Sequence, residues 1–209
     1  MDNISYLLHL FHRGGLVMYP LMIFSLVSIA IAVERFSYYK HHFRQKDGLA
    51  GSIHQALDDQ DWNAAVDVCN NFDTVVSRTI KAGLVQASSP NHSALAVKNA
   101  FEERMSLEAT GLRRYLDYLS AMVTLSPLLG LFGTVTGMIS AFGAMDEGSA
   151  AMAISGGVGE ALVATATGLC VAVVAFVVYT YFNHKFVNVM TNAEDLCFFF
   201  LEHKRGEQA

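Results

Sequence analysis

The chain has 209 residues, of which 53% are hydrophobic and only 16% are charged. The formal net charge of -5 is modest, so the charge balance gives no reason to expect nucleic-acid binding. The hydrophobic residues are gathered in long uncharged runs, which is typical of an integral membrane protein and excludes an ordinary soluble domain.

The first predicted elements are a surface helix and a membrane span. Residues 1–15 contain DNISYLLHLFHR, whose apolar residues fall on one helical face, and predict an amphipathic helix on the outer membrane surface that ends at Gly14 and Gly15. Residues 16–36 form the first predicted span, whose uncharged run at 16–33 is close to the roughly 20 residues that a spanning helix needs. The run is longer than a signal-peptide core, and Arg13 is the one Lys or Arg before it, so we expect this helix to be retained.

The positions of Lys and Arg predict the orientation. Several follow the first run closely: Arg35, Lys40, Arg44 and Lys46. The predicted periplasmic turn at 146–153, by contrast, holds two acids and no Lys or Arg. The positive-inside rule therefore places residues 37–117 and the C-terminal helix at 184–209 in the cytoplasm, with the N-terminus outside.

Residues 37–117 predict a helical cytoplasmic domain. Its apolar residues recur at helical spacing, and SSPNHS at 88–93 is its clearest turn. A charged helix from 93 to 119 meets no breaker before the second span, so we expect one continuous helix there, kinked, if anywhere, near Pro127. The predicted fold is an all-α membrane protein with three transmembrane helices, and helices 2 and 3 extend as long helices into the cytoplasmic domain.

The second and third spans, residues 118–145 and 154–183, each carry a ridge of small residues. Small residues let helix backbones approach in lipid, where apolar side chains have no other reason to associate. The candidate helix-packing residues are Gly130, Gly133, Gly137, Gly168 and Ala172.

The third span also holds one carboxylate, Glu160, and two threonines close behind it, Thr165 and Thr167. A charge inside a membrane normally faces a bundle interior or an aqueous cavity. Thr165 lies roughly 16 Å below the start of its helix, and Thr134 reaches the same depth on the antiparallel second span, so we predict a polar pathway there. Helical periodicity instead places Glu160 and Thr167 on one stripe, and spacing alone does not decide between the two threonines of the third span.

The chain has three cysteines, Cys69, Cys170 and Cys197, and they are isolated from one another. No spacing among them is typical of a metal site, and two fall on the predicted cytoplasmic side, which is reducing. We expect packing roles for them, no metal and no cofactor.

The segments PLLGLFGTVTGMISAF, at 127–142, and GGVGEALVATATGL, at 156–169, together resemble the paired signature of the MotA/TolQ/ExbB proton-channel family. The resemblance is strongest to the ExbB branch, with TolQ second. It covers residues 125–182 strongly and the first span loosely. Thr136 stands where these branches often carry Trp.

The resemblance implies a subunit of the bacterial inner membrane that forms a homo-pentamer. Its second and third helices would line a pore that holds an ExbD/TolR-like dimer of single-span chains, and an aspartate of that dimer would take and release the proton. The family's threonines correspond to Thr134 and Thr165 and its glutamate to Glu160, which favours Thr165 over Thr167. Proton flow would then drive work through a TonB/TolA-like protein.

The branch and the ion stay open. ExbB-like energising of TonB-dependent outer-membrane transport is the first expectation, and TolQ-like envelope maintenance is the second. Threonine oxygens suit either a proton wire or a sodium site. A passive scaffold in the lipid would need only the glycine ridges. An intramembrane enzyme is disfavoured, because Ser126, Ser140 and Ser155 have no membrane-embedded histidine as a base and His184 lies at the inner boundary.

Overall fold

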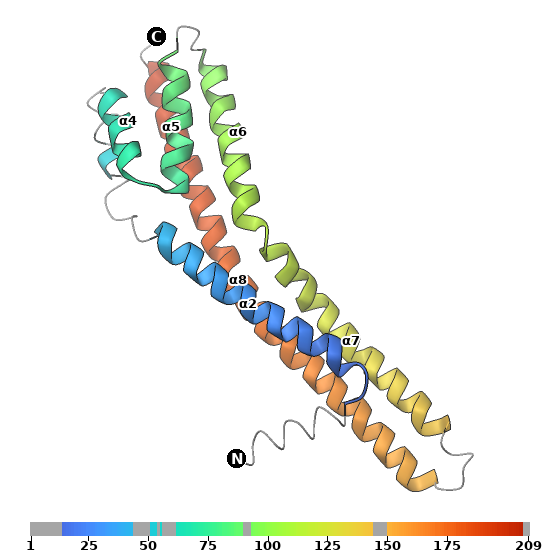
Figure 1. Cartoon of the computed structure of the whole chain (residues 1–209). Coiled ribbons are helices and arrows are strands. Elements are labelled where there is room, and N and C mark those ends of the chain that lie inside the picture. Colours follow the sequence, from blue (N-terminus) through green and yellow to red (C-terminus); the bar gives the residue numbers. More distant parts are fainter. Residues whose placement is uncertain are drawn as a thin grey trace. The chain divides into compact units, whose positions relative to one another are not determined.

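A computed structural model of the chain describes residues 14–43, 51–53, 55, 62–89, 93–143 and 150–206 (Figure 1). The helices are α2 (Met18–Phe43), α4 (Trp62–Asn71), α5 (Val75–Ala87), α6 (Ala94–Arg113), α7 (Leu116–Gly143) and α8 (Ala150–Gly206). Within the described ranges every regular element is a helix, so the all-α prediction is confirmed. Residues 1–13 of the predicted surface helix and residues 144–149 around the predicted turn lie outside the described residues.

The chain folds into two compact units, each built from segments that are far apart in the sequence. The spanning unit comprises residues 1–33 and 115–181, and the charged unit comprises residues 34–114 and 182–209. Helices α2 and α8 contribute residues to both units.

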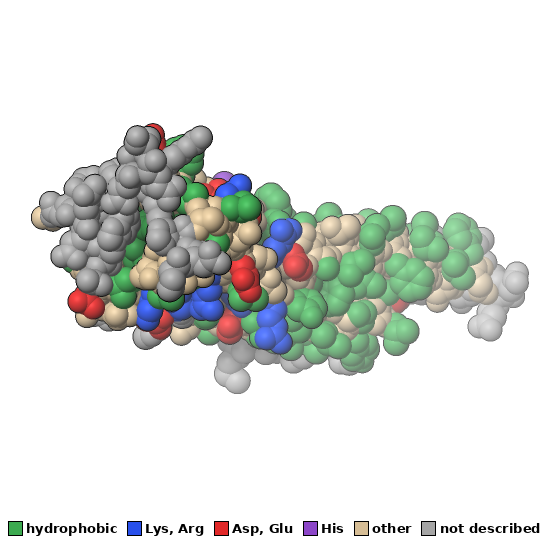
Figure 2. All heavy atoms as spheres, turned by 90° about the horizontal axis from the view of Figure 1, so that it is seen from above, with side chains coloured by type: hydrophobic (Ala, Val, Ile, Leu, Met, Phe, Trp, Pro, Cys, Tyr) green, Lys and Arg blue, Asp and Glu red, His purple; other side chains and the backbone are tan. Residues whose placement is uncertain are grey.

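Three helices are long and apolar enough to cross a membrane: Met18–Lys40, Leu116–Gly143 and Ser155–Glu202. Their large apolar side chains are widely exposed, and Ile139 and Leu162 expose 66% and 63% of their surface. Figure 2 shows such side chains crowded over the spanning unit. Contiguous apolar surface of this kind requires lipid or another protein against it. The prediction of three transmembrane helices is therefore confirmed by length and composition.

Helix α8 extends far beyond a membrane span. It has 57 residues, or about 85 Å at helical rise, against a bilayer core of about 30 Å. It begins at Ala150, so the last four residues of the predicted turn belong to the helix instead.

The expected continuous helix from 93 to 119 is interrupted. Helix α6 ends at Arg113, Arg114 and Tyr115 form a turn, and α7 begins at Leu116. The buried guanidinium of Arg35 donates a hydrogen bond over 3.1 Å to the Leu112 carbonyl at the end of α6. That bond satisfies one of the carbonyls left open at a helix end, and Gly111 lies in the last turn of α6 just before the break.

In the charged unit, α5 and α6 pack around Phe101, whose ring centroid lies 5.3 Å from that of Phe200 in α8. Both rings are fully buried. Gly83 in α5 lies directly under the Phe101 ring, where a methyl group would collide. Each of the two helices begins with a hydroxyl cap: Thr74 accepts from the Ser77 amide, and Ser93 accepts from the Ala96 amide.

Candidate functional site

The candidate site is the seam between α7 and α8, where the two backbones come into direct contact. A methyl group on Gly130 would lie 3.0 Å from the Thr165 Cα and 3.2 Å from the Ala164 carbonyl oxygen. A methyl group on Gly168 would lie 2.6 Å from the Ser126 carbonyl oxygen and 3.1 Å from the Gly130 Cα. A methyl group at Gly168 would have to displace backbone, and one at Gly130 would be tightly crowded, so the close approach of the helices depends on glycine at these positions.

The seam continues toward the turn between the helices. A methyl group on Gly133 would lie 2.5 Å from the Ala164 Cβ, and one on Gly137 would lie 3.0 Å from the Gly157 carbonyl oxygen. Of the predicted packing residues, Gly130, Gly133, Gly137 and Gly168 therefore all lie in this seam, and Ala172 is buried one turn further along α8. Gly157 also lies in the seam but was not among the predicted residues, since it falls in the glycine-rich stretch GGVG at 156–159, which does not show by itself which glycine packs.

Thr165 is the polar residue that joins the two helices. Its hydroxyl donates to the Gly130 carbonyl across the seam over 2.9 Å, and the side chain is half-buried. That carbonyl is reachable because Gly130 has no side chain to hold the helices apart. Thr165 thus places a hydroxyl between two apolar spans, the arrangement that a polar pathway requires.

Thr134 uses its hydroxyl differently. It lies about one helical turn along α7 from Gly130, whose carbonyl accepts the Thr165 hydroxyl. The Thr134 hydroxyl donates to the Leu131 carbonyl of its own helix over 2.7 Å. The two hydroxyls bond to backbone carbonyls and not to each other, and a polar pathway that they share at one depth stays a prediction.

Thr167 bonds within α8, where its hydroxyl donates to the Val163 carbonyl over 2.8 Å. A bond to the carbonyl four residues back is the usual way in which a threonine satisfies itself inside a helix. The geometry therefore separates the two threonines that spacing left equal: Thr165 contacts the neighbouring helix, and Thr167 contacts its own.

Glu160 is half-buried beside the turn that precedes α2. Its carboxylate lies against Gly15, so closely that a methyl group there would collide with Oε1. Val17, two residues on, approaches Gly133 of α7. The acid thus lies on the flank of α8 that faces the start of α2, a neighbour that sequence reasoning missed because Gly14 and Gly15 were interpreted only as a helix end.

Pro127 lies inside α7 without ending the helix. The preceding Ser126 is fully buried, and its hydroxyl donates to the Met122 carbonyl over 2.7 Å. Met122 in turn accepts a hydrogen bond at its sulfur from Ser28 of α2 over 3.2 Å. A kink at Pro127 stays a prediction.

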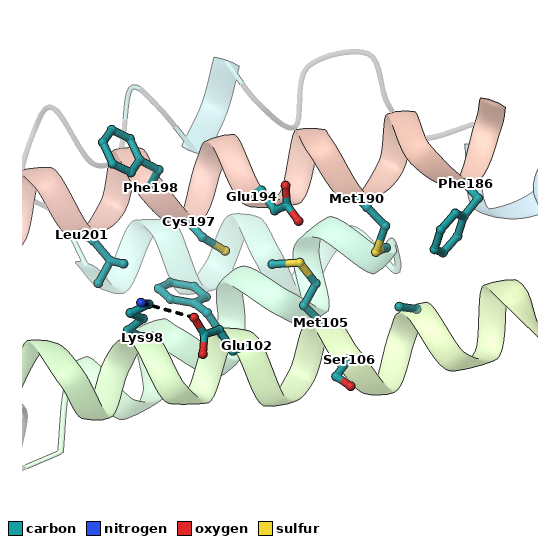
Figure 3. Close-up of a pocket in the computed structure, with 12 residues that line it drawn as sticks. Lys98, Glu102, Met105, Ser106, Phe186, Met190, Glu194, Cys197, Phe198 and Leu201 are labelled. Carbon is teal, nitrogen blue, oxygen red and sulfur yellow. Dashed lines mark ion pairs between the residues drawn. The ribbon is translucent and has the colours of Figure 1, made fainter. Parts of the chain in front are cut away.

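A separate cavity of about 670 Å³ lies between α6 and α8 within the charged unit (Figure 3). Its wall is mostly apolar and includes Phe101, Met105, Phe186, Met190 and Phe198. Lys98 and Glu102 at its edge form an ion pair of 3.5 Å, and Glu194 adds one further carboxylate. These groups do not form a nucleophile with an adjacent base. Among the described residues, no three His, Cys, Asp or Glu side chains are placed to hold a metal ion.

The sequence profile of the MotA/TolQ/ExbB proton channel family matches residues 71–195, which include the whole seam. The chain is 30% identical over 165 residues to a Synechocystis protein named biopolymer transport protein ExbB-like 3, with 77% of each chain covered. It is 29% identical over 184 residues to the biopolymer transport protein ExbB of Salmonella typhimurium, covering 81% of this chain and 72% of that one. It is also 33% identical over 97 residues to the Tol-Pal system protein TolQ of Haemophilus influenzae, covering 46% and 42%.

Proposed function

Because the chain belongs to the MotA/TolQ/ExbB proton channel family, we propose that it is an ExbB-like motor subunit that couples proton flow to mechanical work. The family and the three apolar helices make it a multi-pass membrane protein and an ExbB/TolQ-type channel subunit. The observation that carries the finer proposal is the Thr165 hydroxyl, which is held at the α7–α8 seam against the backbone of Gly130.

The proposed assembly is a homo-pentamer around an ExbD/TolR-like dimer of single-span chains, in the bacterial inner membrane with the N-terminus in the periplasm and the C-terminus in the cytoplasm. Two observations support it. The outer faces of α7 and α8 keep large apolar side chains exposed, such as Leu131 and Val173, which suit lipid or a neighbouring copy. No aspartate lies within residues 16–36, 118–145 or 154–183, so a partner helix has to supply one if an aspartate carries the proton.

Within this assembly Thr134, Glu160 and Thr165 line the proton path. The threonine hydroxyls both accept and donate hydrogen bonds, which a chain of water molecules needs at its walls. Glu160 concentrates cations or orients the partner helix. Proton flow then rotates the partner dimer and acts through a TonB/TolA-like protein on TonB-dependent outer-membrane transport.

The test is proton flux into liposomes that contain the full-length chain co-purified with an ExbD/TolR-like single-span chain. Thr165→Val should lower the flux about tenfold or more while the complex still assembles, because valine keeps the shape but neither donates nor accepts a proton. Thr167→Val is the matched control and should change the flux by less than about twofold, since its hydroxyl is bonded within its own helix. Normal flux in Thr165→Val would contradict the proposal.

The scaffold alternative makes a different prediction at Glu160. The small residues of the seam are sufficient for a packed hairpin without the acid, so a scaffold tolerates Glu160→Ala with partner-dependent activity unchanged. A motor subunit loses that activity. Replacing the proton gradient by a sodium gradient in the same liposomes distinguishes the two ions.

A TolQ-like role in envelope maintenance is the second candidate, and the similarity to the TolQ protein of Haemophilus influenzae supports it. The similarity to named ExbB proteins extends over more of the chain, which is why we favour the ExbB-like role. Deletion of the gene separates the two: loss of TonB-dependent uptake supports the first role, and leakage of periplasmic proteins supports the second.

A further inference from the structure

We propose that Gly15 is a positioning residue for Glu160, and that the turn before α2 thereby fixes where the acid of the third span lies. The consequence for proton flux rests on the proposed function, whereas the contact between the two residues does not.

A side chain at position 15 would meet the carboxylate where it now lies. A methyl group on Gly15 would collide with Glu160 Oε1 and would lie 3.0 Å from its Cδ and 3.5 Å from its Cγ. Gly15 also has a φ of +67°, in the left-handed region that residues with a Cβ rarely adopt. The backbone conformation favours glycine, and the present position of the acid requires that no Cβ be there.

The turn itself is held in place from both ends. The Met18 amide donates to the Gly15 carbonyl over 3.2 Å, which starts the first turn of α2. Val17 is buried and approaches Gly133, where a methyl group would lie 3.7 Å from the Val17 Cβ. Leu21, one turn into α2, is fully buried.

Of the two residues, Glu160 can shift more easily. Its carboxylate ends a flexible side chain, whereas Gly15 belongs to a backbone that is anchored by α2 and α7. A Cβ at position 15 would consequently displace the carboxylate before it displaced the turn. The turn before α2 therefore determines the position of the Glu160 carboxylate, although α2 contributes none of the threonines.

The experiment compares proton flux and thermal unfolding for full-length variants co-purified with the single-span chain. Gly15→Ala and Gly15→Asn both add a Cβ, and asparagine tolerates the left-handed backbone, so Gly15→Asn separates the collision from backbone strain. Both variants should lower the flux about tenfold, since a misplacement of about 1 Å at a reacting group is costly. Flux that falls in Gly15→Ala but not in Gly15→Asn would assign the effect to strain and overturn the proposal.

Glu160→Asp supplies the rescue. Its carboxyl group is withdrawn by one methylene, so adding Gly15→Ala to Glu160→Asp should lower the flux by less than about twofold further. Gly14→Ala is the matched control, because its methyl group would meet the Met18 side chain and not Glu160. Gly14→Ala should change the flux equally in the unaltered chain and in Glu160→Asp. Equal losses from Gly15→Ala in both backgrounds would mean a merely structural glycine.

The two proposals fail in different ways. If Glu160→Gln alone leaves the flux normal, the role of the acid in the proposed function is wrong. The unfolding measurement then still decides the contact: Gly15→Ala should lower the unfolding temperature less in Glu160→Ala than in the unaltered chain. An equal lowering in both would overturn the inference.

Discussion

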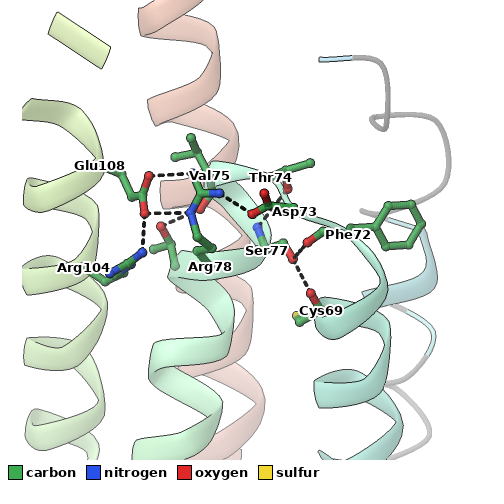
Figure 4. A network of polar contacts seen from close by, with 10 residues as sticks. Cys69, Phe72, Asp73, Thr74, Val75, Ser77, Arg78, Arg104 and Glu108 are labelled. Carbon is green, nitrogen blue, oxygen red and sulfur yellow. Dashed lines mark hydrogen bonds and ion pairs between the residues drawn. The ribbon is translucent and has the colours of Figure 1, made fainter. Parts of the chain in front are cut away.

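Hydroxyls donate to backbone carbonyls in both units, and the charged unit adds a network of ion pairs around Arg78. In the spanning unit the hydroxyls of Ser126, Thr165 and Thr167 all donate to backbone carbonyls. In the charged unit Arg78 donates to both oxygens of Glu108 over 2.8 Å and also to Asp73 (Figure 4). A hydroxyl can use a helix carbonyl without any partner from outside, whereas an ion pair is stable only where water or several partners share the charge.

The two units also differ in the size of the residues at their helix contacts. The seam of α7 and α8 is made of glycine and alanine, because close backbone approach is what stabilises helix pairs in lipid. The charged unit packs large side chains such as Phe101 and Phe200, because burying apolar area from water is what stabilises it. Enlarging a residue should therefore destabilise the seam of the spanning unit, whereas making a residue smaller should destabilise the core of the charged unit.

The largest expected effect is the loss of Phe101 in the charged unit. Phe101→Ala should lower the free energy of unfolding by about 3–5 kcal/mol, because it removes a buried ring from between Gly83 and Phe200. Chemical denaturation of the full-length chain in nanodiscs, followed by circular dichroism, measures this. Phe198→Ala is the control, since that ring is 70% exposed. Equal losses for both would show that this unit is not stabilised as we describe.

The next effect comes from enlarging the seam of the spanning unit. Gly168→Ala should cost about 1–3 kcal/mol of unfolding free energy, because its methyl group would meet the Ser126 carbonyl and the Gly130 backbone, which cannot turn aside. Gly143→Ala at the end of α7 meets nothing within 4 Å and should be neutral or slightly stabilising. A neutral Gly168→Ala would mean that the seam tolerates larger residues, and the two units would then not differ in the size of residue that their helix contacts require.

The spanning unit was the more predictable of the two. Long apolar runs predict spans because the bilayer fixes their length, and glycines at three- and four-residue steps predict a seam because only small residues allow one. Spacing alone did not decide between Thr165 and Thr167, and the resemblance favoured Thr165; in the structure the partner carbonyl distinguishes them. The roles of Thr134, Glu160 and Thr165 in proton movement stay predictions.

What the sequence could not indicate are contacts between distant segments. At the break between α6 and α7, Arg35 bonds to Leu112, which is 77 residues away along the chain. The local sequence offers only Gly111 as a weak signal of a break, since an isolated glycine is tolerated inside a helix. The neighbour of Glu160 is similar: Gly15 lies in another segment, and the spacing of α8 alone gives no information about it.

A third prediction concerns how the stability of the charged unit depends on pH. Burial tends to raise the pKa of Glu108, but the hydrogen bonds and charge of Arg78, together with Arg104, outweigh burial and hold it below its ordinary value. A lowered pKa in the folded state stabilises the fold above the ordinary pKa of a glutamic acid, and that stability is lost as the pH falls through the lowered value. Arg78→Met should cost about 1–2 kcal/mol at neutral pH, a discounted figure because Arg78 is partly exposed.

The same variant should also flatten the dependence of unfolding on acid pH, since Glu108 then no longer gains from being charged in the folded state. Thermal unfolding temperatures recorded from neutral to acid pH measure this dependence. Lys98→Met, which removes the exposed ion pair with Glu102, is the control. An acid dependence that is unchanged in Arg78→Met would place the relevant carboxylates elsewhere.

The smallest effect compares single hydroxyls in the two units. Thr74 caps α5 by accepting from the Ser77 amide over 3.1 Å, and it is buried, so Thr74→Ala should cost about 1 kcal/mol of unfolding free energy. Thr167→Val in the spanning unit should cost close to nothing, because its hydroxyl bonds a Val163 carbonyl that already belongs to the helix ladder. The two losses differ because an amide in the first turn of a helix has no hydrogen-bond partner within the helix, whereas a carbonyl in mid-helix has one. Equilibrium unfolding in nanodiscs resolves the two values, and a Thr167→Val loss as large as that of Thr74→Ala would mean that hydroxyls stabilise both units alike.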